Sequence, residues 1–353
     1  MVLYSGYDYG MATVGGILIS LSTSFNLLFK GRVTGMSGIF YGLITLNEII
    51  WRLALILGMV WTSSLFRYAA GKDSWFFDSS QENLKNLSLG GFAVAGYLVG
   101  LGTKMANGCT SGHGVCGLPR LSKRSFVAVG TFCAFGIATA TLRYYKNFLY
   151  ESEIIQTADN LNSELFHMIF FICVSVVLFS LICFLAFKKK WEDVRDFIIS
   201  FITGVVFSLG LVISGMNRRR KVIGFLTANA DWDPSLMFVL FSAVTLNFIL
   251  FNLITRKKKT PVFAEKYGFS SNSVIDFRLI AGSAIFGIGW GISGLCPGPL
   301  FVSFFVYMPH LIIFLVCLVA GQMSVFAYDK VADKIRRNME AEEPETLKPN
   351  VYI

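Results

Sequence analysis

The sequence predicts an all-α integral membrane protein with about nine transmembrane helices and four shorter re-entrant segments. Of its 353 residues, 54% are hydrophobic and 15% are charged, and the mean hydropathy is +0.60. A soluble chain carries roughly 25% charged residues. Apolar stretches near 20 residues recur along the sequence, which is about the length that crosses a bilayer. The two halves also share one glycine and cysteine pattern.

The apolar stretches predict the position of each span. The predicted spans are residues 10–30, 47–66, 88–106, 124–143, 166–187, 195–216, 235–255, 276–295 and 308–328. Four further stretches each follow a span and are too short to cross a bilayer: 33–46, 107–119, 217–230 and 296–306. They are too apolar or glycine-rich for ordinary loops. Irregular backbone is tolerated at membrane depth only beside protein or a wet cavity, so re-entrant segments are predicted.

The glycine and cysteine pattern indicates an internal duplication. The spacing G-x-G-x6-C occurs twice, 187 residues apart, at Gly100, Gly102 and Cys109 and again at Gly287, Gly289 and Cys296. At an offset of 188 residues a second match pairs Gly16, Ser20 and Leu21 with Gly204, Ser208 and Leu209. Glycine is common in membrane helices, so the argument depends on the shared offset and the shared order.

Counting spans makes the second half an inverted copy of the first. Each half holds four spans and two short segments, and the single span at 166–187 separates them. Inverted repeats with interrupted helices are common in transporters. The predicted units are 1–150, the first repeat; 151–194, a connecting helix and loop; 195–329, the inverted second repeat; and 330–353, a polar C-terminal tail.

The charge distribution predicts the orientation. The net charge is +9, and the basic residues lie at the ends of apolar segments, which argues against nucleic-acid binding. Nine Lys or Arg fall on the face of the N-terminus and twenty on the opposite face. The positive-inside rule therefore puts the N-terminus outside and the C-terminus on the cytoplasmic or matrix side. The expected location is a plasma or bacterial inner membrane, with the mitochondrial inner membrane as the alternative for a eukaryotic chain.

The richest chemical signal is the glycine-rich stretch 107–125. Glycines there allow tight turns that expose backbone N–H groups, and successive free amides form anion-binding concavities. Thiols can donate weakly to soft acceptors. We therefore expect a passage for a small sulfur-containing anion, without cofactor or metal, built on Gly108, Cys109, Gly112, His113, Gly114 and Cys116 from the first half and Gly294, Cys296 and Gly298 from the second.

Several simpler interpretations compete with this one. Cys109, His113 and Cys116 form C-x3-H-x2-C, which could bind zinc with one further ligand. The glycines could equally serve close helix packing. Lys104, near the end of a span, is most simply a residue whose ammonium reaches to the membrane surface. Glu48, placed four residues before a span arginine, fits a helix-stabilising pair better than a proton relay.

These motifs resemble a known family. The stretch Ser111–Ser125, SGHGVCGLPRLSKRS, resembles the sulfur-transport domain of the YeeE/YedE family. The second half looks like a companion protein that some bacteria encode separately, on the motifs Ser214-Gly-Met216, Lys221–Leu226, Trp232–Leu236 and Phe286–Pro299. The resemblance covers most of residues 10–328, so the chain would be a fusion of the two proteins.

The resemblance implies thiosulfate uptake through an hourglass-shaped protein. Re-entrant segments from both faces would meet at its centre, and cysteines would pass the anion inward by S–H contacts. Cys109 and Cys296 match the cysteines of the two central loops, and Cys116 belongs to the GHGVCG variant. The family pattern has a further cysteine near the first short segment, and residues 32–38 of this chain have none. That departure leaves a different substrate or weaker transport open.

The sequence therefore leaves three candidate functions open. The first is a non-enzymatic permease for thiosulfate or a similar anion, partnered only by the anion and the lipid bilayer. The second is a transport-derived structural subunit of a larger membrane complex. The third is a membrane sulfurtransferase with Cys109 or Cys116 as persulfide carrier, which would need a cation beside the thiol, such as Arg120 or Lys123.

Overall fold

The fold was analysed in a computed structural model. The structure describes residues 6–70, 76, 87–149, 169, 173, 175–177, 180, 190–269, 273–304 and 310–342. The described residues include eight helices that are long and apolar enough to cross a membrane. The predicted all-α membrane fold is therefore confirmed. The predicted span at 166–187 lies largely outside the described residues, as do most of the connecting segment 151–194 and residues 343–353 of the predicted tail.

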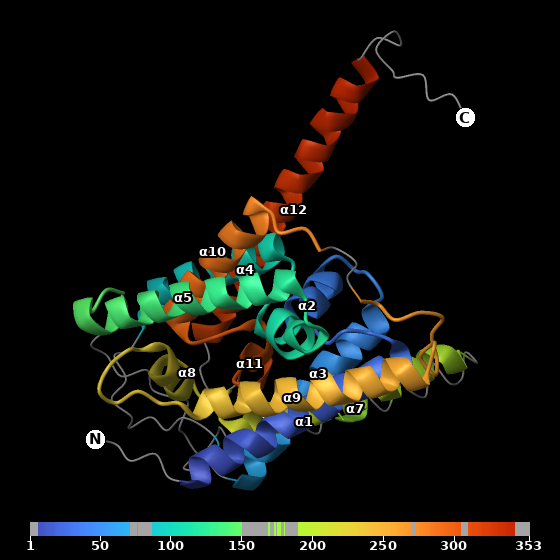
Figure 1. Cartoon of the computed structure of the whole chain (residues 1–353), viewed down its shortest axis with the longest axis horizontal. Coiled ribbons are helices and arrows are strands. Elements are labelled where there is room, and N and C mark those ends of the chain that lie inside the picture. Colours follow the sequence, from blue (N-terminus) through green and yellow to red (C-terminus); the bar gives the residue numbers. More distant parts are fainter. Residues whose placement is uncertain are drawn as a thin grey trace.

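The eight long helices form two layers of four (Figure 1). One layer contains α1 (Gly6–Lys30), α3 (Ile49–Ala70), α7 (Trp191–Ser214) and α9 (Ser235–Lys257). The other contains α4 (Leu89–Ala106), α5 (Lys123–Lys146), α10 (Phe277–Ser293) and α12 (His310–Glu342). Most bounds agree with the predicted spans. Helix α12 differs, because it continues through the first half of the predicted tail and extends beyond the bundle in Figure 1.

The packing order within each layer is the one expected of a duplicated chain. In the first layer α1 packs against α7 and α9, and α7 packs against α1 and α3. In the second layer α4 packs against α10 and α12, and α10 packs against α4 and α5. The sequence offset pairs α1 with α7, α3 with α9, α4 with α10 and α5 with α12. When each helix is exchanged for its counterpart, the same helices remain neighbours in both layers. This exchange supports the two-repeat division, which stays a prediction, as does the inverted sense of the second repeat.

The repeated glycines lie at matching helix crossings. A Cβ atom at Gly100 would lie 2.0 Å from a backbone oxygen of α12, and one at Gly287 would lie 2.5 Å from a backbone oxygen of α5. Gly102 of α4 faces α10, and Gly289 of α10 faces α4. A Cβ at either position would lie 2.9 Å or less from a backbone atom of the other helix. Small residues permit such close backbone approach in membranes. The G-x-G part of the repeated pattern therefore serves helix packing.

Short helical segments occupy the space between the layers. They are α2 (Met36–Ile44), η1 (Thr110–Gly117) with the following turn η2 (Leu118–Arg120), α8 (Arg219–Leu226) and α11 (Pro297–Val302). Each falls within one of the four short stretches of the sequence. Helix α2 contacts both η1 and α11, and Figure 1 places α2 and α11 between the layers. Their depth in a bilayer, and hence their re-entrant character, remains a prediction.

The outer faces of the long helices are apolar. Phe241 on α9 is 73% exposed, Val316 on α12 is 61% exposed and Leu142 on α5 is 54% exposed. In a soluble protein such side chains would form a large unfavourable patch. On a membrane protein they are the surface that lipid covers, so the polar interior between the layers is the place to look for function.

Candidate functional site

Two equivalent turns deliver the paired cysteines to the centre. Asn107 is the C-cap of α4 and Gly294 is the C-cap of α10, and both residues have left-handed backbone, with φ of 55° and 69°. Two residues later Cys109 and Cys296 stand as the N-caps of η1 and α11, in extended conformation. Asn and Gly tolerate positive φ best, which explains these two residues. Both thiols are buried.

Hydroxyl groups connect the two cysteines. Cys109 Sγ lies 3.3 Å from Ser111 Oγ, and Thr110 Oγ1 lies 3.4 Å from Cys296 Sγ. Ser111 Oγ also accepts a hydrogen bond from the backbone N–H of Met36, at 3.0 Å. Three short segments, α2, η1 and the start of α11, thus converge here. We call these five residues the constriction. The two cysteines are predicted from the sequence, whereas the hydroxyls of Thr110 and Ser111 are not.

Glycines lie where the short segments meet, and one of them leaves no room for a side chain. Gly35, just before α2, and Gly112 of η1 are in contact, and a Cβ on the first would meet the Cα of the second at 3.6 Å, an ordinary van der Waals distance. A Cβ at Gly108 would lie 2.6 Å from the His113 ring. A side chain at Gly108 would therefore displace the histidine. Gly298 lies opposite Met36, with a virtual Cβ 3.4 Å from its Cγ.

His113 is buried and held at both ring nitrogens. Nε2 lies 3.2 Å from the carbonyl oxygen of Ala106, and Nδ1 lies 3.2 Å from Ser125 Oγ. A carbonyl can only accept, so Nε2 carries a proton and donates to it. The neutral ring then accepts from the Ser125 hydroxyl. His113 is in this way fixed beside the turn that precedes Cys109.

Cys116 lies apart from the constriction. It is fully buried in a small cluster with Leu27 and Phe251, and its Sγ lies 3.9 Å from the carbonyl oxygen of Thr34. Cys116 lines neither of the two cavities described below, and the same is true of Gly114 and Gly294. Among the described residues no group of three His, Cys, Asp or Glu side chains could hold a metal ion, so the zinc interpretation gains no support.

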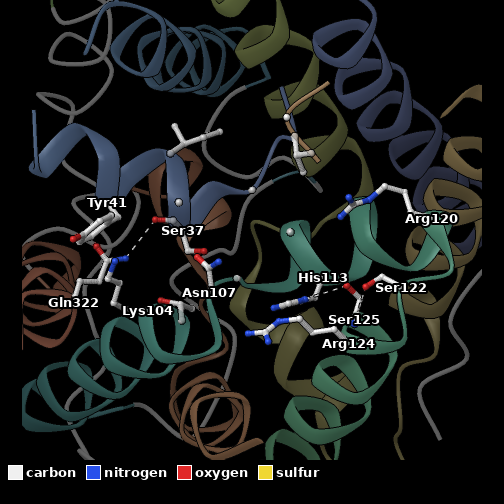
Figure 2. A pocket seen from close by; sticks show the side chains of 18 of the residues that line it. Ser37, Tyr41, Lys104, Asn107, His113, Arg120, Ser122, Arg124, Ser125 and Gln322 are labelled. Atoms are coloured by element: carbon white, nitrogen blue, oxygen red, sulfur yellow. Dashed lines mark hydrogen bonds between the residues drawn. The ribbon is translucent and has the colours of Figure 1, made fainter. Parts of the chain in front are cut away.

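A polar cavity of about 360 Å³ opens on one side of η1 (Figure 2). Gly108, Gly112 and His113 line it, together with the basic side chains Arg52, Lys104, Arg120 and Arg124. Among its described lining residues there is no Asp or Glu. The cavity therefore presents positive charge and hydrogen-bond donors to whatever enters it.

A smaller apolar cavity of about 60 Å³ lies against other residues of η1. Thr110, Ser111 and Cys296 line it, together with bulky side chains such as Phe207 and Leu236. The two cavities share none of their described lining residues, yet η1 contributes to both. The constriction thus borders the apolar cavity directly, and η1 connects it to the cationic one.

The fold and this site define a class: a multi-span α-helical membrane protein with an interior polar cavity and a separate cluster of thiol and hydroxyl groups, both built partly on η1. A family model described as "Family of unknown function (DUF6691)" matches residues 195–338. A "Probable transporter" of Xylella fastidiosa strain Temecula1 is 39% identical over 128 residues, which cover 36% of this chain and 86% of the relative. Another "Probable transporter" of that strain is 40% identical over 134 residues, 38% of this chain and 94% of the relative. The chain belongs to the family of these proteins.

Proposed function

We propose that the chain is a membrane transporter that passes thiosulfate or a similar small sulfur-containing anion through the constriction. The names of the two relatives support transport in general. Each relative is less than half as long as this chain, which supports the interpretation of two joined repeats. The YeeE/YedE resemblance supports the sulfur-containing substrate, and the excess of basic residues on one face supports an N-terminus outside.

The arrangement of Cys109, Ser111, Thr110 and Cys296 is the observation that carries the proposal. An anion in a low-dielectric passage is costly unless donors replace its water. The two hydroxyls and two thiols can each donate. The first amides of η1 have no acceptor within their own helix, and a helix N-terminus carries positive potential. This part of the chain therefore offers consecutive donors of the kind that a thiosulfate ion needs.

Near the first short segment the family pattern has a cysteine, whereas this chain has a backbone amide that is hydrogen-bonded to a hydroxyl group. Residues 32–38 contain no cysteine, but the Met36 N–H binds Ser111 Oγ at 3.0 Å. An amide discriminates less than a thiol between sulfur and oxygen acceptors. We expect this segment to bind oxyanions generally, so the preference for sulfur would come from Cys109 and Cys296.

The apolar cavity favours the second candidate, a structural subunit of a membrane complex. Its bulky lining, including Phe207 and Leu236, gives an entering anion few donors. In that role the centre would stay closed and other chains would cover the molecule. The sulfurtransferase has less support, because Cys116 is buried against the Thr34 carbonyl and not beside a reachable substrate.

Uptake into vesicles separates these functions. We expect the purified protein in liposomes to take up [35S]thiosulfate, and the Cys109→Ala and Cys296→Ala variants to insert and fold but to lose uptake at least a hundredfold. Monodisperse elution in detergent checks their folding. Uptake no faster than that of protein-free liposomes would exclude the permease. Undiminished uptake by both variants would remove the thiols from the mechanism and leave an anion pore.

A further inference from the structure

One end of the polar cavity gathers polar groups that the constriction does not use. Figure 2 shows Ser37, Tyr41, Lys104 and Gln322 together at this end, while His113 and Arg124 lie at the other. Lys104 Nζ lies 3.5 Å from the centre of the Tyr41 ring. Within the described part of the chain, Lys104 has no carboxylate within ion-pair distance. The carboxylate that acts on it electrostatically, Asp329, lies beyond that distance and pairs with Arg278 at 2.7 Å, so the Lys104 charge is only partly neutralised.

Buried polar atoms at the same end lack partners. Gln322 is 1% exposed, its Nε2 reaches the Ser37 carbonyl oxygen only at 3.5 Å, and its Oε1 has no partner among the described residues. The Nε atom of Arg52 is likewise buried without a described partner. Such groups are rare in native structures and call for an explanation. The Gln322 NH2 group has a second N–H besides the one that faces Ser37, and this second N–H can be donated to a ligand in the cavity.

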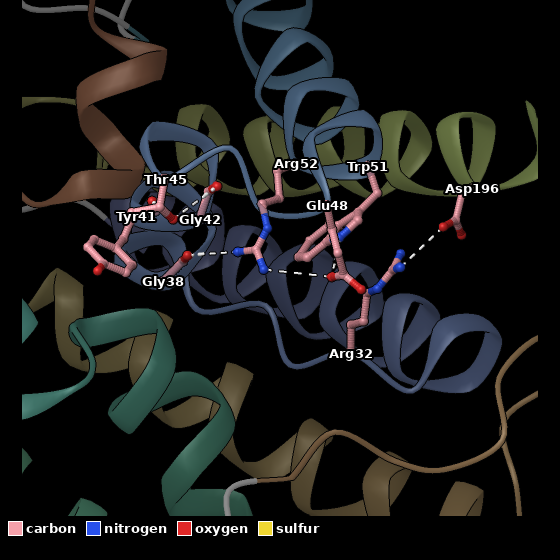
Figure 3. Close-up of polar contacts among 9 residues, drawn as sticks. All are labelled: Arg32, Gly38, Tyr41, Gly42, Thr45, Glu48, Trp51, Arg52 and Asp196. Atoms are coloured by element: carbon pink, nitrogen blue, oxygen red, sulfur yellow. Dashed lines mark hydrogen bonds and ion pairs between the residues drawn. The ribbon is translucent and has the colours of Figure 1, made fainter. Parts of the chain in front are cut away.

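Arg52 is held in place before any ligand arrives. Its guanidinium lies 4.6 Å from the centre of the Trp51 ring and donates to the Gly38 carbonyl oxygen at 2.9 Å (Figure 3). Gly42 leaves the room for it, since a Cβ there would lie 2.1 Å from Nη1. Its nearest described carboxylate, Glu48, is 3.7 Å away and 56% exposed. The positive charge is thus oriented but only loosely neutralised.

A second arginine shares the Trp51 ring with Arg52. Arg32 lies 4.4 Å from the centre of the same Trp51 ring and pairs with Asp196 of α7 at 3.1 Å. Trp51 Nε1 in turn donates to Glu48 Oε2 at 2.9 Å. The assembly joins α2, α3 and α7 (Figure 3). Because these contacts are already made, binding at Arg52 would order few additional side chains.

We propose that Lys104, Arg52 and Gln322 form a second anion site, which receives the transported ion once it has passed the constriction. As a receiving site it rests on the proposed function. Its chemistry differs from that of the constriction, because no cysteine is among the cavity's described lining residues. It recognises negative charge and oxygen acceptors, so it takes sulfate as readily as thiosulfate. Release then remains possible, since charge attraction to a wide, wet cavity is weaker than a closed set of donors.

The test removes the constriction's thiols and asks whether binding persists. Equilibrium binding of [35S]thiosulfate and [35S]sulfate is measured on the full-length Cys109→Ala/Cys296→Ala protein. We expect both anions to bind, and Lys104→Gln in that background to weaken both at least tenfold. Lys104→Arg should restore most of the binding. Lys123→Gln is the matched control, because it removes one exposed charge from α5 that does not line the cavity.

The outcomes separate this site from the proposed function. Lys104-dependent binding of both anions supports the site, even if the wild-type protein takes up no thiosulfate and the permease fails. Binding that Lys104→Gln leaves unchanged overturns the site, even if uptake by the wild type is rapid. Absence of binding to the doubly substituted protein at millimolar anion overturns it as well. If Lys104→Gln does not elute as folded protein, Gln322→Leu takes its place, with the same tenfold loss expected.

Discussion

The segments that follow Cys109 and Cys296 begin alike and then diverge. Each cysteine follows, by two positions, a residue with left-handed backbone, and each cysteine caps a short helical segment. After Cys109 the chain reads TSGHGVCG, and after Cys296 it reads PGPLFV. The first supplies hydroxyls, a histidine and many amides. The second supplies two prolines, which have no N–H to donate, and three bulky apolar side chains.

This difference indicates that the backbone scaffold and the side chains that follow each cysteine vary independently. Duplication preserves the turn that brings a cysteine to the centre, because helix crossings and caps depend on glycine and backbone conformation. The hydroxyl donors are concentrated in η1, which borders both cavities, whereas α11 borders only the apolar one. The two halves thus share one scaffold but carry different side chains at its centre.

The largest expected effect concerns the shared scaffold. We expect Gly100→Val and Gly287→Val each to prevent recovery of folded protein, because any Cβ there lies within 2.5 Å of a neighbouring backbone oxygen. Overpacking of this kind typically costs about 1–3 kcal/mol, and more where backbone must shift. Gly130 on α5 is the matched control, since a Cβ there meets nothing within 4 Å. Yield and thermal stability in detergent are the measurements. Unequal effects at Gly100 and Gly287 would break the equivalence of the halves.

The next effect concerns the divergent chemistry. Ser111→Ala removes a donor from the path and leaves the buried Met36 amide without its acceptor, and we expect uptake to fall about tenfold, or ~1.4 kcal/mol. Thr110→Val keeps the shape of the side chain but loses the contact with Cys296, and we expect its uptake to fall by a similar factor. Leu300→Ala in α11 is the comparison and should change stability more than uptake. If it lowers uptake of folded protein as much as Ser111→Ala does, the donors are not confined to η1.

The sequence predicts the scaffold better than the path. Spans follow from apolar length, and the paired cysteines follow from spacing. The hydroxyls of Thr110 and Ser111 give no such signal, because Ser and Thr are frequent in membrane helices and only the fold brings them beside thiols. Lys104 illustrates the same limit. Its position near the end of a span suggested an ammonium reaching the membrane surface, whereas in the fold it faces a cavity that α2, α4 and α12 create together.

Glu48 and Arg52 show how a local spacing can mislead. Their separation by four residues suggested a pair on one helix. Helix α3 begins only at Ile49, and Glu48 has a left-handed backbone with φ of 45°, so the carboxylate belongs to the preceding turn. The ion pair exists, at 3.7 Å, but it joins a turn to a helix. Arg52 is thereby turned toward α2 and the polar cavity, which the helical spacing alone could not indicate.

The smallest expected effect distinguishes Cys116, which lies within η1, from Cys109, which caps it. Neither lines a described cavity, but Cys109 contacts Ser111 at the constriction, whereas Cys116 is enclosed by Leu27 and Phe251. A thiol there packs as a small hydrophobic group. We expect Cys116→Ala to lower stability by about 1 kcal/mol for the lost packing and to keep uptake within about twofold of wild type. Cys109→Ala in the same assay should abolish it. If Cys116→Ala also abolishes uptake in protein that elutes as folded, Cys116 must reach the anion in another conformation, and the path would extend along the whole of η1.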